Sequence, residues 1–380
     1  MSSVLGVIGG GQLGMMLTQA SKSINNISKV VVLDPTHNCP AAQVGAEQIQ
    51  ASFDDDNAIR RLASLSDVIT YEIESGDSYT LESLQDVVEI NPSPQTLRII
   101  QDKYKQKKFL AQHGMPIPDF EAVSSYDDIV HVASKFDYPV LLKARRGGYD
   151  GRGNYRVNSI HQIQEALDYF GNTPLMIEKF VPYMMEISVI ISRNIAGQIE
   201  HYTAVENIHE HNILRQTISP ARIPQNVADK AADIAMNTVN VLQGAGVFGI
   251  EMFLLDDHTI LINEIAPRVH NSGHHTMHSA ETSQFEQHIR AVLDMDLGST
   301  KLHGPAVMYN ILGSSDFTGE YRYPQISHPA SHLVMYGKKI SKPLRKLGHL
   351  NIHSADNYTV SQLLDILESI KPQASISPIY

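Results

Sequence analysis

The chain has one cysteine, Cys39, among its 380 residues, so it cannot form an intramolecular disulfide bond. No run approaches the ~20 apolar residues of a membrane span, and no basic and apolar leader resembling a secretion signal precedes the first expected strand. Basic residues are also scarce. The net charge of −11 argues against general binding to nucleic acid or to a membrane surface. We therefore predict a cytoplasmic protein with neither kind of partner.

Glycine is concentrated near the start of the chain, in the stretch GVIGGGQLGMM at residues 6–16. Gly9, Gly11 and Gly14 have the G-x-G-x-x-G spacing, between a strand-like run and apolar residues at helical spacing. A second strand-like run ends at Asp34, so a βαβ unit is predicted. Two interpretations stay open at this point. One is a dinucleotide site in which Asp34 holds a ribose of NAD, and the other is a tight turn whose helix N-terminus can hold any anion.

Strand and helix signals alternate as far as residue 91, which favours a parallel sheet covered by helices. Ser93 and Pro94 predict the start of a helix, and a further helix over about 103–113 ends at Gly114. The proline-rich stretch after that helix is the first expected domain boundary. The segment from about residue 305 is expected to be β-rich, with a closing helix over about 360–370.

Two acidic residues face each other in the expected hairpin GIEMFLLDDHTILINEIAPR, residues 249–268. If DDHT forms a four-residue loop, Leu255 pairs with Ile260. Counting outward, Glu251 then falls opposite Glu264. This register places Phe253, Leu255, Ile260 and Ile262 on the same face as the two carboxylates, and Asn263 on the other face unless a bulge intervenes. Two carboxylates on an apolar face need a cation, and Mg²⁺ suits oxygen ligands. A solvated pair, or one neutralised by arginines, is the alternative.

A second glycine-rich segment, LLKARRGGYDGRGNYRV at residues 141–157, has no helix after its glycines and so is not a P-loop. Lys143 lies at the end of a strand, and Gly147, Gly148, Gly151 and Gly153 follow in the loop. Backbone N–H groups of such a loop can wrap a phosphate, to which Lys143 would add a point charge. A hairpin tip without a ligand is the alternative.

Together with IEKFVPYMMEISV at residues 177–189, these segments resemble the ATP-grasp superfamily. The resemblance implies ATP and Mg²⁺ as cofactors, a glycine loop that closes over the nucleotide, and Glu251 and Glu264 as metal ligands. It implies the following nucleotide-binding residues: Lys103 and Lys143 beside the phosphates, Gly148, Tyr149, Asp150, Gly151 and Gly153 in the loop, Glu178, Lys179, Phe180 and Val181 along the adenine, Glu186 at the ribose, and His209, Asn263 and Glu264.

Five segments narrow the resemblance. GGGQLGMM, YEIES, KARRGGYDGRG, NEIAPRVHNSGHHT and PLRKLGH are similar to the 5-(carboxyamino)imidazole ribonucleotide synthetases of bacterial and fungal purine biosynthesis, over about residues 3–370. In that family ATP phosphorylates bicarbonate to carboxyphosphate, and the amino group of 5-aminoimidazole ribonucleotide then takes the carboxyl group, with release of ADP and phosphate. Such phosphoryl transfer is catalysed mainly by positioning and charge neutralisation. The resemblance also suggests a homodimer.

The fold implied by this resemblance is an α/β ATP-grasp fold in three parts. A Rossmann-like parallel sheet over 1–100 binds substrate. Mixed α+β ATP-grasp domains occupy 101–304, with a lid at about 115–182. A small β-rich domain over 305–380 contributes to the ribonucleotide phosphate site.

For the carboxylation step, the resemblance implies that Arg268 grips bicarbonate and that His270 and Asn271 orient the intermediate. Tyr149 and Asp150 would reach the reacting centre when the glycine loop closes. The ribonucleotide-binding residues are implied to be Gln12, Leu13, Glu74, Arg268, Lys338, Arg345 and Lys346. Taken alone, His270, His274, His275 and His278 would suggest a zinc site, and Lys338, Lys342, Arg345 and Lys346 a solvated basic face. The zinc site is disfavoured because the chain offers one cysteine and no acidic partner at helical spacing.

Other functions are weighed against this one. An NAD dehydrogenase is disfavoured because the opening glycines have a use beside the ribonucleotide, which leaves Asp34 to pack or cap locally or to lie near the substrate. A catalytically silent nucleotide-binding protein is disfavoured because Lys143, Glu251 and Glu264 are all present. Within the superfamily, the nearest competitor is a formate-using transformylase of glycinamide ribonucleotide.

Overall fold

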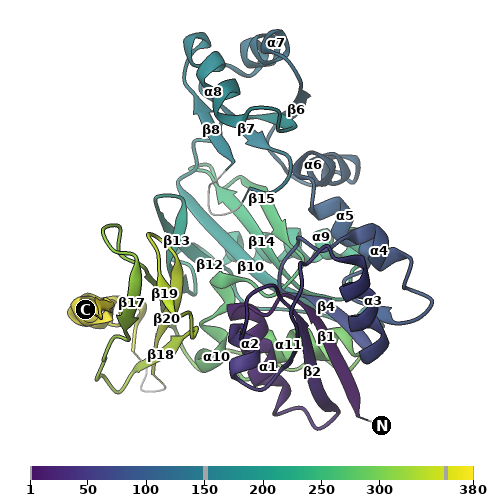
Figure 1. Ribbon diagram of the computed structural model, residues 1–380. Coiled ribbons are helices and arrows are strands. Elements are labelled where there is room, and N and C mark those ends of the chain that lie inside the picture. Colours follow the sequence, from purple (N-terminus) through teal and green to yellow (C-terminus); the bar gives the residue numbers. More distant parts are fainter. Residues whose placement is uncertain (1, 149–152, 355–357, 380) are drawn as a thin grey trace.

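The computed structural model describes residues 2–148, 153–354 and 358–379, in which one upper and two lower lobes adjoin a long central sheet (Figure 1). Among the helices of these ranges, none has the length and apolar character needed to pass through a membrane. Parallel and antiparallel sheets are both present and are covered by helices, so the predicted α/β class is confirmed.

The N-terminal lobe is built on a five-stranded parallel sheet in the order β3-β2-β1-β4-β5. Its strands are β1 (Ser3–Ile8), β2 (Ile27–Leu33), β3 (Glu47–Ile49), β4 (Val68–Tyr71) and β5 (Glu89–Ile90), and its helices are α1 (Gln12–Ser21), α2 (Pro40–Gln43), α3 (Asp56–Leu65), α4 (Ser78–Glu82) and α5 (Pro94–Ile100). Ser93 caps α5 by accepting a hydrogen bond from the Thr96 N–H, and Pro94 is its first residue, as predicted. Gln12 and Glu74 follow β1 and β4, at the edge where such sheets bind ligands.

The upper lobe in Figure 1 is a four-stranded antiparallel sheet in the order β6-β9-β7-β8. Helix α6 (Lys103–Gln112) leads into it, and it contains β6 (Phe120–Val123), α7 (Tyr126–Phe136), β7 (Val140–Ala144), β8 (Asn154–Val157), a 3₁₀ turn (Ile160–Gln162), α8 (Ile163–Phe170) and β9 (Leu175–Lys179). Apolar side chains of α7 and α8 pack with those of β7 and β9 in a separate core. The lobe therefore has a core of its own.

The central sheet has nine strands in the order β15-β14-β10-β12-β13-β16-β20-β18, with β11 beside β10. The elements from β10 to α11 are β10 (Met185–Arg193), β11 (Ile199–His201), β12 (Val205–Glu210), β13 (Ile213–Ser219), α9 (Gln225–Leu242), β14 (Gly246–Leu254), β15 (Ile260–Ala266), a 3₁₀ turn (Asn271–Gly273), α10 (Thr276–Ser279) and α11 (Gln284–Val292). Helix α9 packs on one face of this sheet through Ala231, Ala235 and Val239. Phe285 and Ile289 of α11 share a core with α1, which joins the N-terminal lobe to the sheet.

The C-terminal segment divides between two sheets. Strands β16 (Ala306–Leu312), β20 (Lys346–His353) and β18 (Ser331–Met335) extend the central sheet, whereas β17 (Gly319–Arg322), β19 (Ile340–Ser341) and β21 (Ser377–Pro378) form a small sheet of their own. Helix α12 (Val360–Ile370), at the predicted position, and a 3₁₀ turn (Lys371–Ala374) close the chain. The segment is β-rich as expected, and part of it is continuous with the central sheet.

Candidate functional site

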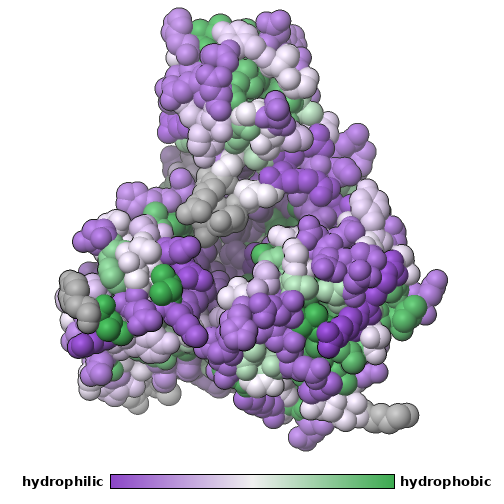
Figure 2. Space-filling model, in the orientation of Figure 1, coloured by the Kyte–Doolittle hydropathy of each residue, from purple (hydrophilic) through white to green (hydrophobic). Residues whose placement is uncertain are grey.

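A cavity of about 1490 Å³ lies where the three lobes meet, and Figure 2 shows the hollow there. Most predicted site residues line it: Gln12, Leu13, Glu74, Lys103, Lys143, Gly148, Glu178, Lys179, Phe180, Val181, Glu186, His209, Glu251, Asn263, Glu264, Arg268, His270, Asn271 and Lys346. Gly153, Lys338 and Arg345 do not line it. Tyr149, Asp150 and Gly151 lie outside the described residues. One cavity thus collects residues from all three lobes.

The glycine turn before α1 is occupied by carboxylates of the chain itself. The Gly11 and Gly14 N–H groups donate to Glu72 at 3.0 and 2.5 Å, and the Gly10 N–H donates to Asp34 at 2.9 Å. A Cβ atom on Gly9 would lie 2.1 Å from Glu72, and one on Gly11 2.6 Å from it. The glycines therefore make room for Glu72, which was not predicted, and the helix N-terminus already holds an anion.

A buried ion cluster lies under the nucleotide side of the cavity. The Lys143 ammonium is 2.9 Å from one Glu178 oxygen and the Lys107 ammonium 3.2 Å from the other. Lys107 also donates to the Ile262 carbonyl at 2.9 Å. Burial and the charge of Lys143 lower the pKa of Lys107 to about 8, although Glu178 opposes this. Because both lysines occupy the Glu178 carboxylate, only the backbone of Glu178 is left to contact an adenine.

The start of α6 is fixed to the base of the glycine loop. Asp102 caps the helix by accepting from the Tyr104 and Lys105 N–H groups, at 3.1 and 3.2 Å. The Arg145 guanidinium also donates to Asp102, at 3.1 and 2.6 Å. Lys103 therefore projects from an anchored helix end into the cavity, where its ammonium lies 2.5 Å from Glu264.

The predicted pairing of Glu251 with Glu264 is observed, but the register that predicted it is wrong near the turn. Leu254, and not Leu255, pairs with Ile260, because the Leu255 N–H bonds the Thr259 carbonyl and so closes a loop one residue shorter than DDHT. A bulge between Met252 and Glu251 then takes up one residue and restores the pairing.

The bulge decides which side chains share the face of the carboxylates. Ile260 and Ile262 lie in the core on the other face of the sheet, contrary to the prediction, whereas Phe253 lines the cavity as predicted. Asn263 is the extra residue of the bulge. Its side-chain oxygen accepts from Lys143 at 3.4 Å, so it does reach the site. Leu255, predicted on the same face, does not line the cavity.

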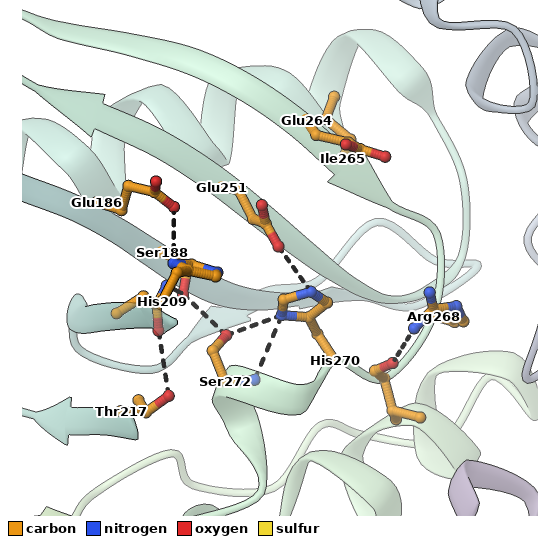
Figure 3. Close-up of polar contacts among 12 residues, drawn as sticks. Glu186, Ser188, His209, Thr217, Glu251, Glu264, Ile265, Arg268, His270 and Ser272 are labelled. Atoms are coloured by element: carbon orange, nitrogen blue, oxygen red, sulfur yellow. Dashed lines mark hydrogen bonds and ion pairs between the residues drawn. The ribbon is translucent and has the colours of Figure 1, made fainter. Parts of the chain in front are cut away.

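Two carboxylates of the cavity are each held by a histidine (Figure 3). The His270 ring donates from Nε2 to Glu251 at 2.9 Å, and His209 Nδ1 lies 3.0 Å from Glu186. Burial raises the pKa of the Glu251 carboxyl, but the hydrogen bond from His270 and the nearby charge of Lys103 outweigh burial and lower it to about 2. Burial lowers the pKa of His209, yet Glu186 reverses this and raises it. The Glu251 carboxylate is therefore kept ionised.

Arg268 links the two sides of the cavity. Its Nε is 2.9 Å from a Glu74 oxygen, which follows β4 of the N-terminal lobe. Its Nη1 donates to the Val269 carbonyl at 3.1 Å. The rest of the guanidinium fork faces a site that Gln12, His270 and Asn271 also line. A planar fork in this position suits an oxyanion.

The basic segment near the C-terminus is only partly directed at the cavity. Lys346, the first residue of β20, lines it. The Lys338 ammonium donates to the Lys346 carbonyl at 2.8 Å, and the Arg345 guanidinium donates to the Ile340 carbonyl at 2.8 Å. Lys338 thus contacts β20, the strand from which Lys346 projects, whereas Arg345 contacts β19 of the small sheet.

The histidines after β15 form a buried cluster against β20. The His274 ring lies 4.8 Å from that of His349, and His275 bonds Ser279 at 2.9 Å. His278 bonds Asn351 at 2.9 Å. Burial lowers the pKa of His275 to about 3 and of His278 to about 4, so both rings are neutral near pH 7. Their partners are protein groups, and their place is at the junction with the C-terminal segment.

Two residues that sequence reasoning missed left signals in the sequence. Lys107 lies four residues after Lys103, on the same face of a helix. Glu72 lies two residues before Glu74, so an extended chain turns both side chains to one side. Ser188 and Ser272, by contrast, left no signal that distinguishes them from other serines.

Family models match along the chain. A ribonucleotide synthetase preATP-grasp domain matches residues 1–101, an ATP-grasp domain residues 108–285, and a phosphoribosylaminoimidazole carboxylase C-terminal domain residues 306–362. The N5-carboxyaminoimidazole ribonucleotide synthase of Bacillus subtilis is 39% identical, over 92% of this chain and 90% of its own. The phosphoribosylaminoimidazole carboxylase of Candida albicans is 41% identical over 92% of this chain, which spans only 64% of that relative's length.

Solved structures agree with these matches. The N5-carboxyaminoimidazole ribonucleotide synthetase of Thermotoga maritima has a TM-score of 0.89 and 39% identity, covering 99% of this chain and 100% of its own. The Aspergillus clavatus synthase, in complex with ADP and 5-aminoimidazole ribonucleotide, has a TM-score of 0.90 and 35% identity, covering 98% of both chains. The ATP-grasp fold predicted from the sequence is confirmed. The chain belongs to the family of N5-carboxyaminoimidazole ribonucleotide synthetases, ATP-dependent ligases of purine biosynthesis.

Proposed function

We propose that this protein carboxylates the amino group of 5-aminoimidazole ribonucleotide with ATP and bicarbonate, releasing ADP and phosphate. The observation that carries the proposal is the single cavity in which Lys103 and Lys143, the Glu251–Glu264 pair and Arg268 meet. The Aspergillus clavatus relative, whose structure holds ADP and the ribonucleotide, supports it. We further propose that the protein is cytoplasmic and acts as a homodimer.

The nucleotide occupies the side of the cavity under the upper lobe. Lys103 and Lys143 face the phosphates, the backbone from Glu178 to Val181 faces the adenine, and Glu186 with His209 faces the ribose. The support is that all these residues line the cavity and that the buried Glu178 carboxylate is neutralised from below. Gly148, at the base of the glycine loop, lies beside the same space.

The donor set at β14 and β15 fits Mg²⁺. Glu251 and Glu264 are direct cross-strand partners, and Asn263 adds a neutral oxygen beside them. Mg²⁺ favours such oxygen ligands and usually takes its remaining ones from water and phosphates. When bound, it would neutralise charge that develops on the phosphoryl oxygens. His270 contacts the Glu251 carboxylate and Lys103 contacts the Glu264 carboxylate, so each of the two side chains is oriented.

Asn271 is suited to bicarbonate. Both polar atoms of its side chain are buried and have no hydrogen-bond partner among the residues that the structure describes. An unpaired buried amide costs about 1–3 kcal/mol, and a ligand that both donates and accepts would remove the cost. Bicarbonate does so through its hydroxyl and its carbonyl oxygen, and the Arg268 fork beside Asn271 supplies charge.

The reaction then needs no protein nucleophile. A bicarbonate oxygen attacks the γ-phosphorus of ATP, and the bond to the bridging oxygen breaks to release ADP. The ribonucleotide amino nitrogen attacks the carbonyl carbon, the C–O bond to phosphate breaks, and the nitrogen loses one proton. The chain's task is to hold these groups in line and to neutralise their charge.

The ribonucleotide occupies the side toward the N-terminal lobe. Gln12, Leu13 and Glu74 line that side, and Lys346 faces it from β20 as the ligand of the 5′-phosphate. Lys338 contributes through its hydrogen bond to the Lys346 carbonyl, and Arg345, whose side chain bonds Ile340 of β19, borders the same segment. Tyr149 and Asp150, outside the described residues, are proposed to border the reacting centre.

The test is ADP release with each substrate omitted in turn. We expect turnover only when ATP, bicarbonate, Mg²⁺ and 5-aminoimidazole ribonucleotide are all present, and none when formate with glycinamide ribonucleotide replaces the last pair of substrates. Turnover with formate would assign the competing transformylase reaction. Binding of NADH, seen by its fluorescence, would reopen the dinucleotide interpretation of the glycine turn.

A further inference from the structure

A row of buried polar side chains runs across the central sheet to His270. Thr217 of β13 donates to Asn207 of β12 at 3.1 Å, and the Asn207 amide donates to Ser188 of β10 at 2.8 Å. Ser188 donates to Ser272 at 2.8 Å, and Ser272 lies 2.9 Å from His270 Nδ1. Figure 3 shows the end of this row, with Ser272 between Ser188 and His270.

The hydrogen bonds along this row all run from donor to acceptor in the same direction, toward His270. The Asn207 amide nitrogen can only donate, so Ser188 accepts there and its own hydroxyl hydrogen goes on to Ser272. Ser272 then has its hydrogen free for His270 Nδ1. The ring accepts at Nδ1, to which the Ser272 backbone N–H also donates at 3.4 Å, and it carries its hydrogen at Nε2, which is the atom 2.9 Å from Glu251. Each hydrogen bond along the row therefore fixes the next one.

The polar side chains of this row are buried, and burying a polar group costs free energy unless it is hydrogen-bonded. Ser188, Thr217 and Ser272 are fully buried and Asn207 is 7% exposed. On β10, Ser188 faces away from the apolar core of Ile187 and Val189 and lies across the strand pair from Glu251. Polar groups in such surroundings are stable only when every donor and acceptor is paired. An apolar replacement would pack as well, so the row points to a requirement at its end, at His270.

We propose that Ser272 and Ser188 are positioning residues for the carboxylation step, which hold His270 as its Nε2–H tautomer aimed at Glu251. The proposal rests on the proposed function, in which His270 borders the bicarbonate side of the cavity. Without the Ser272 hydroxyl, Nδ1 keeps only the Ser272 backbone N–H, 3.4 Å away. The ring then gains the freedom to take the other tautomer or to turn from Glu251.

The direct test is the tautomer of His270 in the full chain, read from ¹⁵N spectra of histidine-labelled protein and assigned with His270→Gln. We expect hydrogen on Nε2 alone in the native protein and a mixture of tautomers in Ser272→Ala. The matched control is Ser192→Ala on β10, the strand of Ser188, since Ser192 is as buried as Ser272 but donates to the Glu200 carbonyl instead. Hydrogen on Nδ1 in the native protein, or an unchanged ring in Ser272→Ala, would overturn the proposal.

Kinetics supply the second readout. Ser272→Ala should lower kcat about tenfold, as loss of an orienting partner commonly does, with KM for ATP and for the ribonucleotide unchanged within about twofold. Ser272→Thr, which restores a hydroxyl, should recover most of the rate. If Ser272→Ala fails to fold, Thr217→Val breaks the row at its far end and should shift the tautomer in the same sense. An unchanged ring there would overturn the proposal as well.

The activity of His270→Gln distinguishes failure of the proposed role of His270 from failure of the proposed role of the serines. If His270→Gln turns over normally, His270 has no part in catalysis, yet the tautomer spectra still decide whether the serines orient its ring. If His270→Gln is slow and the serine variants are not, the role of His270 stands and the positioning role of the serines falls.

Discussion

The two sides of the cavity treat charge in opposite ways. On the N-terminal side, the glycine turn before α1 has its N–H groups taken by Glu72 and Asp34. On the nucleotide side, three lysines are in contact with only two carboxylates, Glu178 and Glu264. The first side is satisfied within the chain, whereas the second has one lysine more than the carboxylates that its lysines contact.

This difference shows why similar glycine patterns lead to different chemistry. A helix N-terminus binds phosphate only while its N–H groups are free. At α1 the Gly11 and Gly14 N–H groups already donate to Glu72. A ligand phosphate is therefore directed to the lysines of the nucleotide side or to Lys346. The difference between the two sides can be tested by substituting Glu72 on the N-terminal side, or a charged residue on the nucleotide side.

The largest effect is expected from Glu264→Gln, which removes one charge from the carboxylate pair. Turnover should fall by about 100-fold, since altered metal coordination commonly costs this much or more. Asp257→Asn, in the exposed loop of the same hairpin, is the matched control and should leave the rate unchanged. ADP release at saturating Mg²⁺ measures both. Normal turnover of Glu264→Gln would remove it from the metal site.

Glu72→Ala tests the satisfied side. It leaves the Gly11 and Gly14 N–H groups unpaired, which should lower the free energy of unfolding by about 2 kcal/mol and raise KM for the ribonucleotide while KM for ATP stays constant. Glu47→Ala on the same sheet, whose ion pair with Lys29 is half exposed, should cost under ~1 kcal/mol. Urea unfolding and initial rates are the measurements. Tighter ribonucleotide binding would show that the turn is a phosphate site after all.

Lys107→Met tests the buried ion cluster on the nucleotide side, because it removes the contact between Lys107 and Glu178. Glu178 keeps Lys143 but loses its second partner, so stability should fall by about 2 kcal/mol at pH 7. The folded pKa of Lys107, about 8, lies under its ordinary value of 10.5, so the unfolded chain binds more protons between these pH values. Stability of the native protein relative to the variant should therefore rise with pH across that window.

The Lys107 comparison is made by urea midpoints at several pH values. Lys230→Met is its control, because Lys230 also donates to a carbonyl, that of His258, but on the surface. A difference between native protein and Lys107→Met that does not change with pH would contradict the assigned charge state.

The smallest effect is expected from Lys346→Ala, which removes one of the cations near the 5′-phosphate. KM for the ribonucleotide should rise about tenfold, as for loss of a charge-assisted hydrogen bond, and KM for ATP should not change. Lys339→Ala, on an exposed neighbour in the same segment, is the control. An unaltered KM would move the phosphate site elsewhere.

Much of the nucleotide side follows from the sequence, because its elements are local. The α6 start, the strand carrying Lys143 and the hairpin carrying Glu251 were each predicted from short-range patterns. The hairpin also shows that a strand register cannot be predicted reliably by counting residues outward from an assumed turn. Alternation places residues two apart on one face, but the shorter turn and the bulge at Asn263 each shift the register by one residue. The pairing of the two glutamates was right, and the faces of Ile260 and Ile262 were wrong.

The long-range contacts could not be predicted in this way. Glu72 fills the turn before α1 because β4 lies beside β1, which depends on the order of strands in the sheet. The row from Thr217 to His270 joins elements that are far apart in the chain, and nothing in a serine's neighbours marks it. Such contacts depend on packing between elements, which periodicity does not encode.

The most direct test of the whole account follows an oxygen atom. With bicarbonate labelled by ¹⁸O and all substrates present, we expect one labelled oxygen in each phosphate released, because a bicarbonate oxygen attacks the γ-phosphorus and leaves with it. Phosphate that carries no label, at full conversion of the ribonucleotide, would contradict phosphorylation of bicarbonate in this cavity.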